Sequence, residues 1–462
     1  MSFKYENKNG WNDLNKSEIK KVMSFSKRYM TFLNNAKTER EAVKEIIKLA
    51  KKEGFISLEE ATQKKLNKPG TKIYSSNRDK SLALFILGKE PMNKGIKIIG
   101  SHIDSPRLDL KPNPMYEDKS LALLKTHYYG GIKKYQWATI ALSLHGVVID
   151  KNGNKIDVSI GDDDNDPVFY ISDLLPHLSK DQISKKMHEG ISGEDLNVII
   201  GSIPHKIKKD SYSVKEGILN ILNEKYGITE EDFISSEFEL VPSFKAKDVG
   251  LDRSLIAGYG HDDKSCAYAS LEAIKDITIP EKTISILFTD KEEIGSYGNS
   301  GGQSRFFEYA IAELINLTNK NYNELLLKQC FSNSKVISAD VGAAFDSTYA
   351  AAYSKYNSAY IGHGVILKKY TGSRGKSGAS DASAEYVGEI RKIFNDNNIS
   401  WQASEMGKVD QGGGGTISYI LANYNADVID CGTPVLSMHA PIELISKVDL
   451  YNTYLAYKCF LN

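Results

Sequence analysis

Short apolar runs that end next to a histidine or an acidic residue are the feature that most limits how this sequence can fold. Four apolar runs, each four to six residues long, lie at residues 82–87, 96–100, 284–289 and 336–339, and the last three end next to a histidine or an acidic residue. Strands this continuously apolar are covered on both faces, as in parallel sheets packed between helices. Helical patterns lie before, between and after these runs, at residues 17–35, 263–277, 306–316 and 382–395. The sequence therefore predicts an α/β fold with a mostly parallel sheet.

The middle of the chain has a different pattern. Between about residues 108 and 249, short β-like stretches alternate with charged loops, of which residues 161–167 are the most acidic. That loop lacks the glycine and glutamate spacing of an EF-hand, so we interpret it as solvated rather than calcium-binding. We expect a core domain formed by residues 1–107 and 250–462, interrupted by an inserted β-rich domain at residues 108–249.

Composition excludes several classes of protein. Lysine plus arginine and aspartate plus glutamate both total 59, and a chain without net charge is not expected to bind nucleic acid. The four cysteines are far apart and form no disulfide framework. No run reaches the roughly 18 apolar residues of a membrane span, and the first residues lack the apolar stretch of a secretory signal. We expect a cytoplasmic protein that makes no contact with membranes.

Residue types suited to metal binding follow three of the apolar runs. His102 and Asp104 come just after the second run, Glu292 and Glu293 after the third, and Asp340 after the fourth. In open α/β sheets, ligands bind outside the carboxyl ends of the strands. We therefore expect these side chains to converge on one site.

Two further candidates are Asp262, in an Asp-Asp pair at the start of a predicted helix, and His439. Two histidines and three carboxylates suit zinc, cobalt or manganese, and five ligands suit two ions that share one carboxylate. Each residue alone has a structural interpretation, since aspartate often begins a helix and a single histidine more often packs than binds. The order of all of them together favours a metal site.

Longer motifs surround these residues, and they occur at residues 101–112, 129–131, 174–178, 262–266, 290–296, 337–340, 410–416 and 436–439. Taken in this order, they resemble the aspartyl aminopeptidase and vacuolar aminopeptidase I family of metallopeptidases, in its bacterial aminopeptidase I-like branch. The resemblance covers most of the chain. It implies a metallopeptidase α/β core with an inserted β-rich domain used for assembly.

The resemblance also implies roles for individual residues. The implied metal ligands, with Asp262 shared by two ions, are His102, Asp262, Glu293, Asp340 and His439. Glu292 corresponds to the general base, and Asp104 to the carboxylate that orients His102. His177 corresponds to an inserted-domain histidine that reaches the site of a neighbouring subunit, and a buried structural histidine is the alternative.

The implied function is a metal-dependent aminopeptidase that removes N-terminal amino acids from short peptides with a free amine. It would use two divalent ions, which we expect to be zinc, with cobalt and manganese as alternatives. It would also form a homo-oligomer, which is a tetrahedral dodecamer in many family members. Residues 341–345, 132–137 and 368–376 depart from the aspartyl branch, which leaves open whether an acidic or a neutral N-terminal residue is preferred. The alternatives are a related di-metal amidohydrolase or deacylase, and a non-catalytic assembly protein on the same fold.

Overall fold

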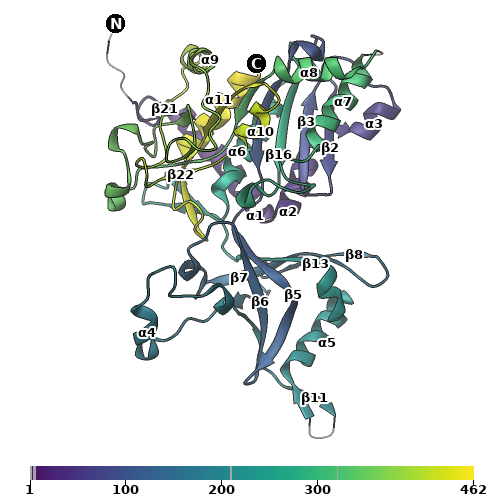
Figure 1. Ribbon diagram of the computed structural model, residues 1–462, viewed down its shortest axis with the longest axis vertical. Helices are drawn as coiled ribbons and strands as arrows, with labels where there is room; N and C mark the ends of the chain where they lie inside the picture. Colours follow the sequence, from purple (N-terminus) through teal and green to yellow (C-terminus); the bar gives the residue numbers. More distant parts are fainter. Residues whose placement is uncertain (1–2, 4–6, 209–210, 320) are drawn as a thin grey trace. The chain divides into compact units, whose positions relative to one another are not determined.

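The computed structural model describes residues 3, 7–208, 211–319 and 321–462, and the chain forms two compact units (Figure 1). Unit 1 comprises Met1–Asp104, Ala246–Met438 and Glu443–Asn462. Unit 2 comprises Ser105–Lys245 and His439–Ile442. Unit 1 is therefore built from three separate stretches of sequence.

Unit 1 contains a nine-stranded sheet in the order β1-β2-β3-β16-β4-β17-β23-β19-β21. Five of its eight strand pairings are parallel, and three are antiparallel. This confirms the predicted α/β fold with a mostly parallel sheet. The strands are β1 (Ile56–Ser57), β2 (Lys72–Asn77), β3 (Ser81–Ile86), β4 (Lys97–His102), β16 (Ile284–Thr289), β17 (Lys335–Ser338), β19 (Val365–Lys368), β21 (Trp401–Ala403) and β23 (Asp427–Gly432).

Two smaller sheets complete the strands of unit 1. A five-stranded sheet has the order β14-β15-β25-β24-β18, and β20 pairs with β22. Their bounds are β14 (Lys247–Val249), β15 (Leu255–Gly258), β18 (Gly342–Ala343), β20 (Gly372–Ser373), β22 (Gly413–Gly414), β24 (Pro434–Leu436) and β25 (Glu443–Ser446).

Helices cover both faces of the large sheet, as the unbroken apolar strands predict. Side chains alternate along β3: Leu82 and Leu84 belong to one hydrophobic core, whereas Ala83 and Phe85 belong to another. The first core includes residues of α1 (Lys16–Asn35), α2 (Glu39–Lys52), α6 (His261–Lys275), α9 (Ala384–Asp396) and α11 (Lys447–Leu461). The second includes residues of α3 (Leu58–Gln63), α7 (Phe306–Thr318), α8 (Glu324–Ser332) and α10 (Ser418–Ala422).

Local signals set the starts of the first two helices. The Asn15 side chain accepts hydrogen bonds from two backbone N–H groups of α1, and Glu18 bonds back to the Asn15 N–H. Thr38 and Glu41 form the same reciprocal arrangement, a capping box, at α2. Each box satisfies backbone donors that a helix start otherwise leaves unbonded.

Unit 2 is built on a seven-stranded antiparallel sheet in the order β13-β5-β6-β10-β9-β7-β8. Strand β13 pairs with β5 and also with β7, so the sheet closes on itself as a barrel. The elements of unit 2 are β5 (Arg107–Asp118), β6 (Leu121–Tyr129), β7 (Ala141–Ile149), β8 (Lys155–Ile160), β9 (Phe169–Tyr170), α4 (Lys180–Ile183), β10 (Val198–Gly201), β11 (His205–Lys208), β12 (Ser211–Ser213), α5 (Val214–Tyr226) and β13 (Ser236–Pro242).

Unit 2 is β-rich as predicted, but it also contains α5, which the sequence reading did not anticipate. Ser213 caps the start of this helix, and Gly227 ends it at φ +72°. Only Val214 and Gly217 are buried along it, although its apolar residues recur at the three- and four-residue spacing of a helix face. In the part of the chain that the structure describes, no helix combines the length and apolar character needed to cross a membrane.

Candidate metal centre

The candidate site lies at the carboxyl ends of three neighbouring parallel strands of unit 1. Strand β4 runs between β16 and β17, and it ends at His102, which is in register with Thr289 at the end of β16. Asp340 lies two residues beyond β17. The chain therefore delivers a histidine and several carboxylates to one edge of the sheet, where α/β proteins bind ligands.

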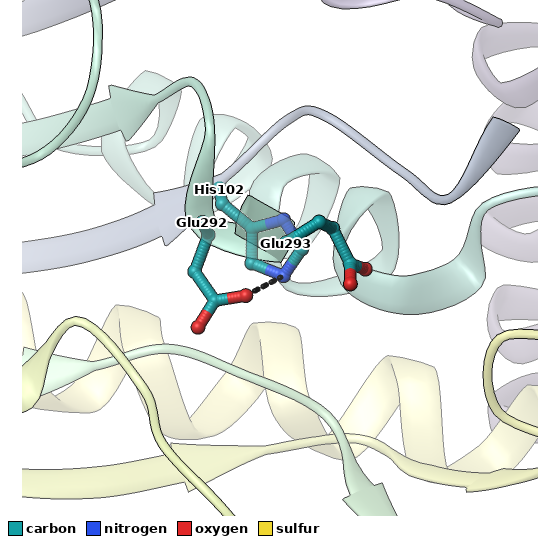
Figure 2. Close-up of side chains that lie close together, drawn as sticks. All are labelled: His102, Glu292 and Glu293. Carbon is teal, nitrogen blue, oxygen red and sulfur yellow. Dashed lines mark ion pairs between the residues drawn. The ribbon is translucent and has the colours of Figure 1, made fainter. Parts of the chain in front are cut away.

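The buried ring of His102 has a different partner on each nitrogen. Its Nδ1 lies 3.1 Å from the backbone oxygen of Asp104 and 3.3 Å from the Asp104 carboxylate. Its Nε2 lies 3.1 Å from Asp262 Oδ1 and 3.8 Å from Glu292 Oε2, the contact drawn as a dashed line in Figure 2. With a proton on Nδ1, the Nε2 lone pair faces the carboxylates, which is how a metal-binding imidazole is held.

Asp104 links this histidine to the loop that carries the two glutamates. Its Oδ1 accepts a hydrogen bond from the Glu292 N–H, and its Oδ2 accepts one from the Glu293 N–H, both at 3.2 Å. Lys291, at φ +66°, turns the chain after β16 into the 3₁₀ helix η6 (Glu292–Ile294). Figure 2 shows the two glutamate carboxylates on different sides of the His102 ring. One carboxylate thus positions both the imidazole and the glutamate pair.

The first residues of α6 contribute two more carboxylates. The Asp262 N–H donates a hydrogen bond to Glu443 Oε2 at 3.0 Å, which fixes the backbone at this position. Asp263 is fully buried, and neither of its carboxylate oxygens has a hydrogen-bond partner among the described residues. Ligand atoms of His102, Asp263 and Asp340 all lie within 4.8 Å of one another.

The ionisation of the site shows that its carboxylates are crowded. Burial raises the pKa of Glu292 to about 8, with the charges of Asp340, Asp104 and Asp262 adding to the shift and that of His102 opposing it. Burial likewise raises the pKa of Asp340 to about 7, although Lys368 lowers it. Burial alone would lower the pKa of His102, but its bonds to Asp104 and Asp262 raise it well above the usual value.

These groups fit a divalent metal. A fully buried carboxylate without a hydrogen-bond partner is costly unless a cation binds it, and Asp263 is such a group. A second set of atoms within 4.8 Å comes from His102, Glu292 and Glu293. Imidazole nitrogen together with carboxylate oxygen is a donor set for zinc, cobalt or manganese.

The two remaining predicted histidines lie in unit 2. His439 has its Nδ1 2.9 Å from the carbonyl oxygen of Gly131. Its assignment as a metal ligand stays a prediction. His177 lies in the 3₁₀ helix η3 (Pro176–Leu178) and is exposed, which contradicts the alternative of a buried structural histidine. Its reach into a neighbouring subunit also stays a prediction.

Three residues of the site were not assigned from the sequence. Lys368 ends β19, is buried, and donates a hydrogen bond from Nζ to the Val341 carbonyl at 3.0 Å. The strand-end rule that found His102 does not extend to this lysine, because β19 runs antiparallel to β23. Asp263 was visible only as half of an Asp-Asp pair. Glu443 gave no local signal, because its contact with Asp262 spans 181 residues.

A mostly parallel α/β sheet with histidine and carboxylates at its strand ends is an arrangement suited to a metal-dependent hydrolase. The comparisons with known proteins agree with this class. The chain belongs to the Peptidase M18 family, aminopeptidase I zinc metalloprotease, whose family model matches residues 32–461. It is therefore a metallo-aminopeptidase, a hydrolase that acts on peptide bonds.

The relatives match over almost the whole length. A probable M18 family aminopeptidase 1 from Clostridium acetobutylicum is 52% identical over 458 residues, which are 99% of this chain and 98% of the relative. The crystal structure of the M18 aminopeptidase from Thermotoga maritima has a TM-score of 0.95 at 46% identity, covering 99% of this chain and 100% of that one. The mApe1 dodecamer of Saccharomyces cerevisiae shares the fold, with a TM-score of 0.78 at 20% identity, covering 96% and 97%.

Proposed function

We propose that the chain hydrolyses the N-terminal residue of short peptides with two divalent ions and Glu292 as the general base. The ligands would be His102, Asp262, Glu293, Asp340 and His439, with Asp262 shared. The observation that carries this proposal is the position of Glu292. Its carboxylate lies 3.8 Å from His102 Nε2, and its backbone is bonded to the same Asp104 that orients the ring.

When bound, two divalent ions lower the pKa of water and polarise a carbonyl group. Glu292 accepts the proton of the attacking water and passes it to the amine that leaves. Asp104 keeps the proton of His102 on Nδ1, so that Nε2 remains a lone-pair donor. Lys368 offsets part of the negative charge of Asp340.

The test compares free-amine and N-acetylated peptides on zinc-loaded protein, with Glu292→Gln as the variant. We expect hydrolysis of the free-amine peptides only, and its loss in Glu292→Gln with metal content unchanged. Hydrolysis of the N-acetylated peptides would favour the amidohydrolase alternative instead. A panel with acidic and neutral N-terminal residues, assayed with zinc, cobalt and manganese, measures the preference that the sequence leaves open.

We also propose that the working protein is a homo-oligomer, with twelve chains as in the yeast relative. The region around His177 supports this, because large apolar side chains there are 45–74% exposed: Leu174, Leu175, Leu178, Ile183 and Met187. A single chain rarely leaves so many apolar groups together in water. In the assembly, His177 would enter the site of a neighbouring chain.

Light scattering tests the assembly, and a twelve-chain particle of 51.4 kDa subunits would have a mass of about 600 kDa. His177→Ala should lower kcat without changing the mass or the zinc content. His188→Ala is the matched control, since this exposed histidine lies in the same unit. A monomeric mass, or equal activity of both variants, would contradict the role in a neighbouring subunit.

A further inference from the structure

A cavity of about 400 Å³ lies in unit 1 between α1, α11 and the end of α6, and it includes none of the residues of the metal centre. One helix face lines much of it. Ser17, Lys20, Lys21, Ser24 and Arg28 recur along α1 at the three- and four-residue spacing that places side chains on one face. The volume lies within the range of small-molecule sites.

Not all the positively charged side chains on this face of α1 form salt bridges within the described part of the chain. In the described part of the chain, Lys20 and Lys21 have no salt-bridge partner, and both are exposed. Arg28 lies 3.6 Å from Glu272, and its guanidinium lies over the Phe25 ring at 5.5 Å. The two lysines therefore leave positive charge on the wall of the cavity.

The acidic residues of the lining already have partners. Glu272 lies 2.7 Å from Lys275 as well as near Arg28, and Asp276 accepts hydrogen bonds from Lys458 and the Tyr454 hydroxyl. Their charges are therefore offset by cations of α6 and α11. An anionic ligand would meet the lysines of α1 without an uncompensated carboxylate opposite them.

The other wall of the cavity is aromatic. Tyr451 and Tyr454, on α11, have ring centroids 5.6 Å apart, and both pack on Phe25 at 5.5 and 4.9 Å. Both tyrosines are partly exposed. A flat ring can stack on such a surface whatever its hydrogen-bonding edge, as bases do on aromatic side chains of nucleic-acid-binding proteins.

We propose that this cavity binds a nucleoside monophosphate, with the phosphate at Lys20 and Lys21 and the base on the tyrosine rings. Inorganic phosphate alone would not use the aromatic wall of the cavity, and a neutral ring alone would not use the lysines. A ligand that carries both an anion and a flat ring uses both halves. The site is separate from the metal centre and does not depend on the peptidase mechanism.

The experiment is calorimetric titration of the full-length, zinc-loaded protein with AMP, inorganic phosphate and adenosine. We expect saturable AMP binding with a Kd below about 1 mM, and weaker binding of phosphate and adenosine. The double variant Lys20→Glu, Lys21→Glu should weaken AMP binding at least tenfold. Tyr451→Ala should weaken AMP binding but not phosphate binding.

Lys27→Glu is the matched control, because it reverses an exposed charge of the same helix outside the cavity. It should leave AMP affinity unchanged, and all these variants should keep the basal peptidase rate. Absence of AMP binding at millimolar concentration would overturn the proposal. So would phosphate binding as tight as that of AMP, or an unchanged affinity in the double lysine variant.

Discussion

The two units treat buried charge in different ways. In unit 2, Arg107 Nε lies 2.8 Å from Asp109 and 3.2 Å from Glu239, and its guanidinium lies 3.8 Å from the centre of the Tyr129 ring. In the metal centre of unit 1, burial raises the pKa values of Glu292 and Asp340 to about 8 and about 7. In the first cluster a cation of the chain lies against both carboxylates, whereas in the second we propose that bound metal ions compensate the carboxylates.

The largest effect should come from Glu292→Gln. The amide keeps the shape of the side chain but cannot accept the proton, so kcat should fall between about 10²- and 10⁴-fold. Steady-state assays and elemental analysis of bound zinc measure the rate and the metal separately. Glu385→Gln, exposed on α9, is the matched control and should be fully active. Full activity of Glu292→Gln would remove it from the role of base.

In unit 2, Arg107→Met should cost about 3–5 kcal/mol of unfolding free energy, because Glu239 stays buried without this partner. Urea titration with and without zinc measures this loss of unfolding free energy, which should be the same under the two conditions. Lys111→Met is the control, because the Lys111–Glu194 pair is exposed and should contribute at most about 1 kcal/mol. A loss that zinc restores would show that the two clusters are not independent.

Zinc itself should stabilise the protein by about 2.7 kcal/mol when its free concentration is 100 times Kd, since only the folded site binds it. Thermal unfolding with and without a chelator measures this difference. Asp340→Ala should reduce the difference, whereas Arg107→Met should retain it. Equal zinc stabilisation of Asp340→Ala and the unaltered protein would exclude Asp340 from the metal site.

The smallest expected change in stability concerns Asp449, which shows a third way of burying an acidic side chain. It is fully buried in α11 and accepts hydrogen bonds from the Gly362 and Gly364 N–H groups at 2.7 Å each. Burial raises its pKa to about 8, with these two bonds opposing the shift. The folded state therefore keeps a proton that the unfolded state releases above about pH 4, and this contribution to stability is lost as pH rises towards 8.

Unfolding free energies of zinc-loaded protein at pH 6, 7 and 8 test this sign. Asp449→Asn cannot ionise, so its unfolding free energy should fall less steeply with pH than that of the unaltered protein. The difference between the two slopes should be up to about 1.4 kcal/mol per pH unit. The comparison is between slopes, so a uniform loss of stability in the variant does not affect it. Parallel slopes would show that Asp449 is ionised in the folded protein throughout this range.

The parts of the fold that the sequence predicted depend on local signals. Residues 284–289 form β16 with the predicted bounds, because the run is apolar on both faces of the strand. The capping box that begins α2 is also a local signal, a threonine followed three residues later by a glutamate. Helix α5 was not predicted, although Val214, Ile218 and Leu222 recur at helical spacing between a serine cap and a glycine.

The site likewise contains residues that local sequence signals predict and residues that only long-range packing brings in. The strand-end rule placed His102 and Asp340 on one edge of the sheet, since both follow apolar strands that turned out to be parallel neighbours. The contacts of Lys368 with Val341 and of Glu443 with Asp262 depend on how distant segments pack. Single-sequence patterns carry no record of such packing.

The most direct test of the central claim is the number of zinc ions bound per chain, measured by competition with a chromophoric chelator. The account predicts two equivalents for the unaltered protein. It also predicts the loss of both in Asp262→Ala, because that carboxylate is proposed to be shared. One equivalent in the unaltered protein, or unchanged zinc binding in Asp262→Ala, would contradict the two-ion centre.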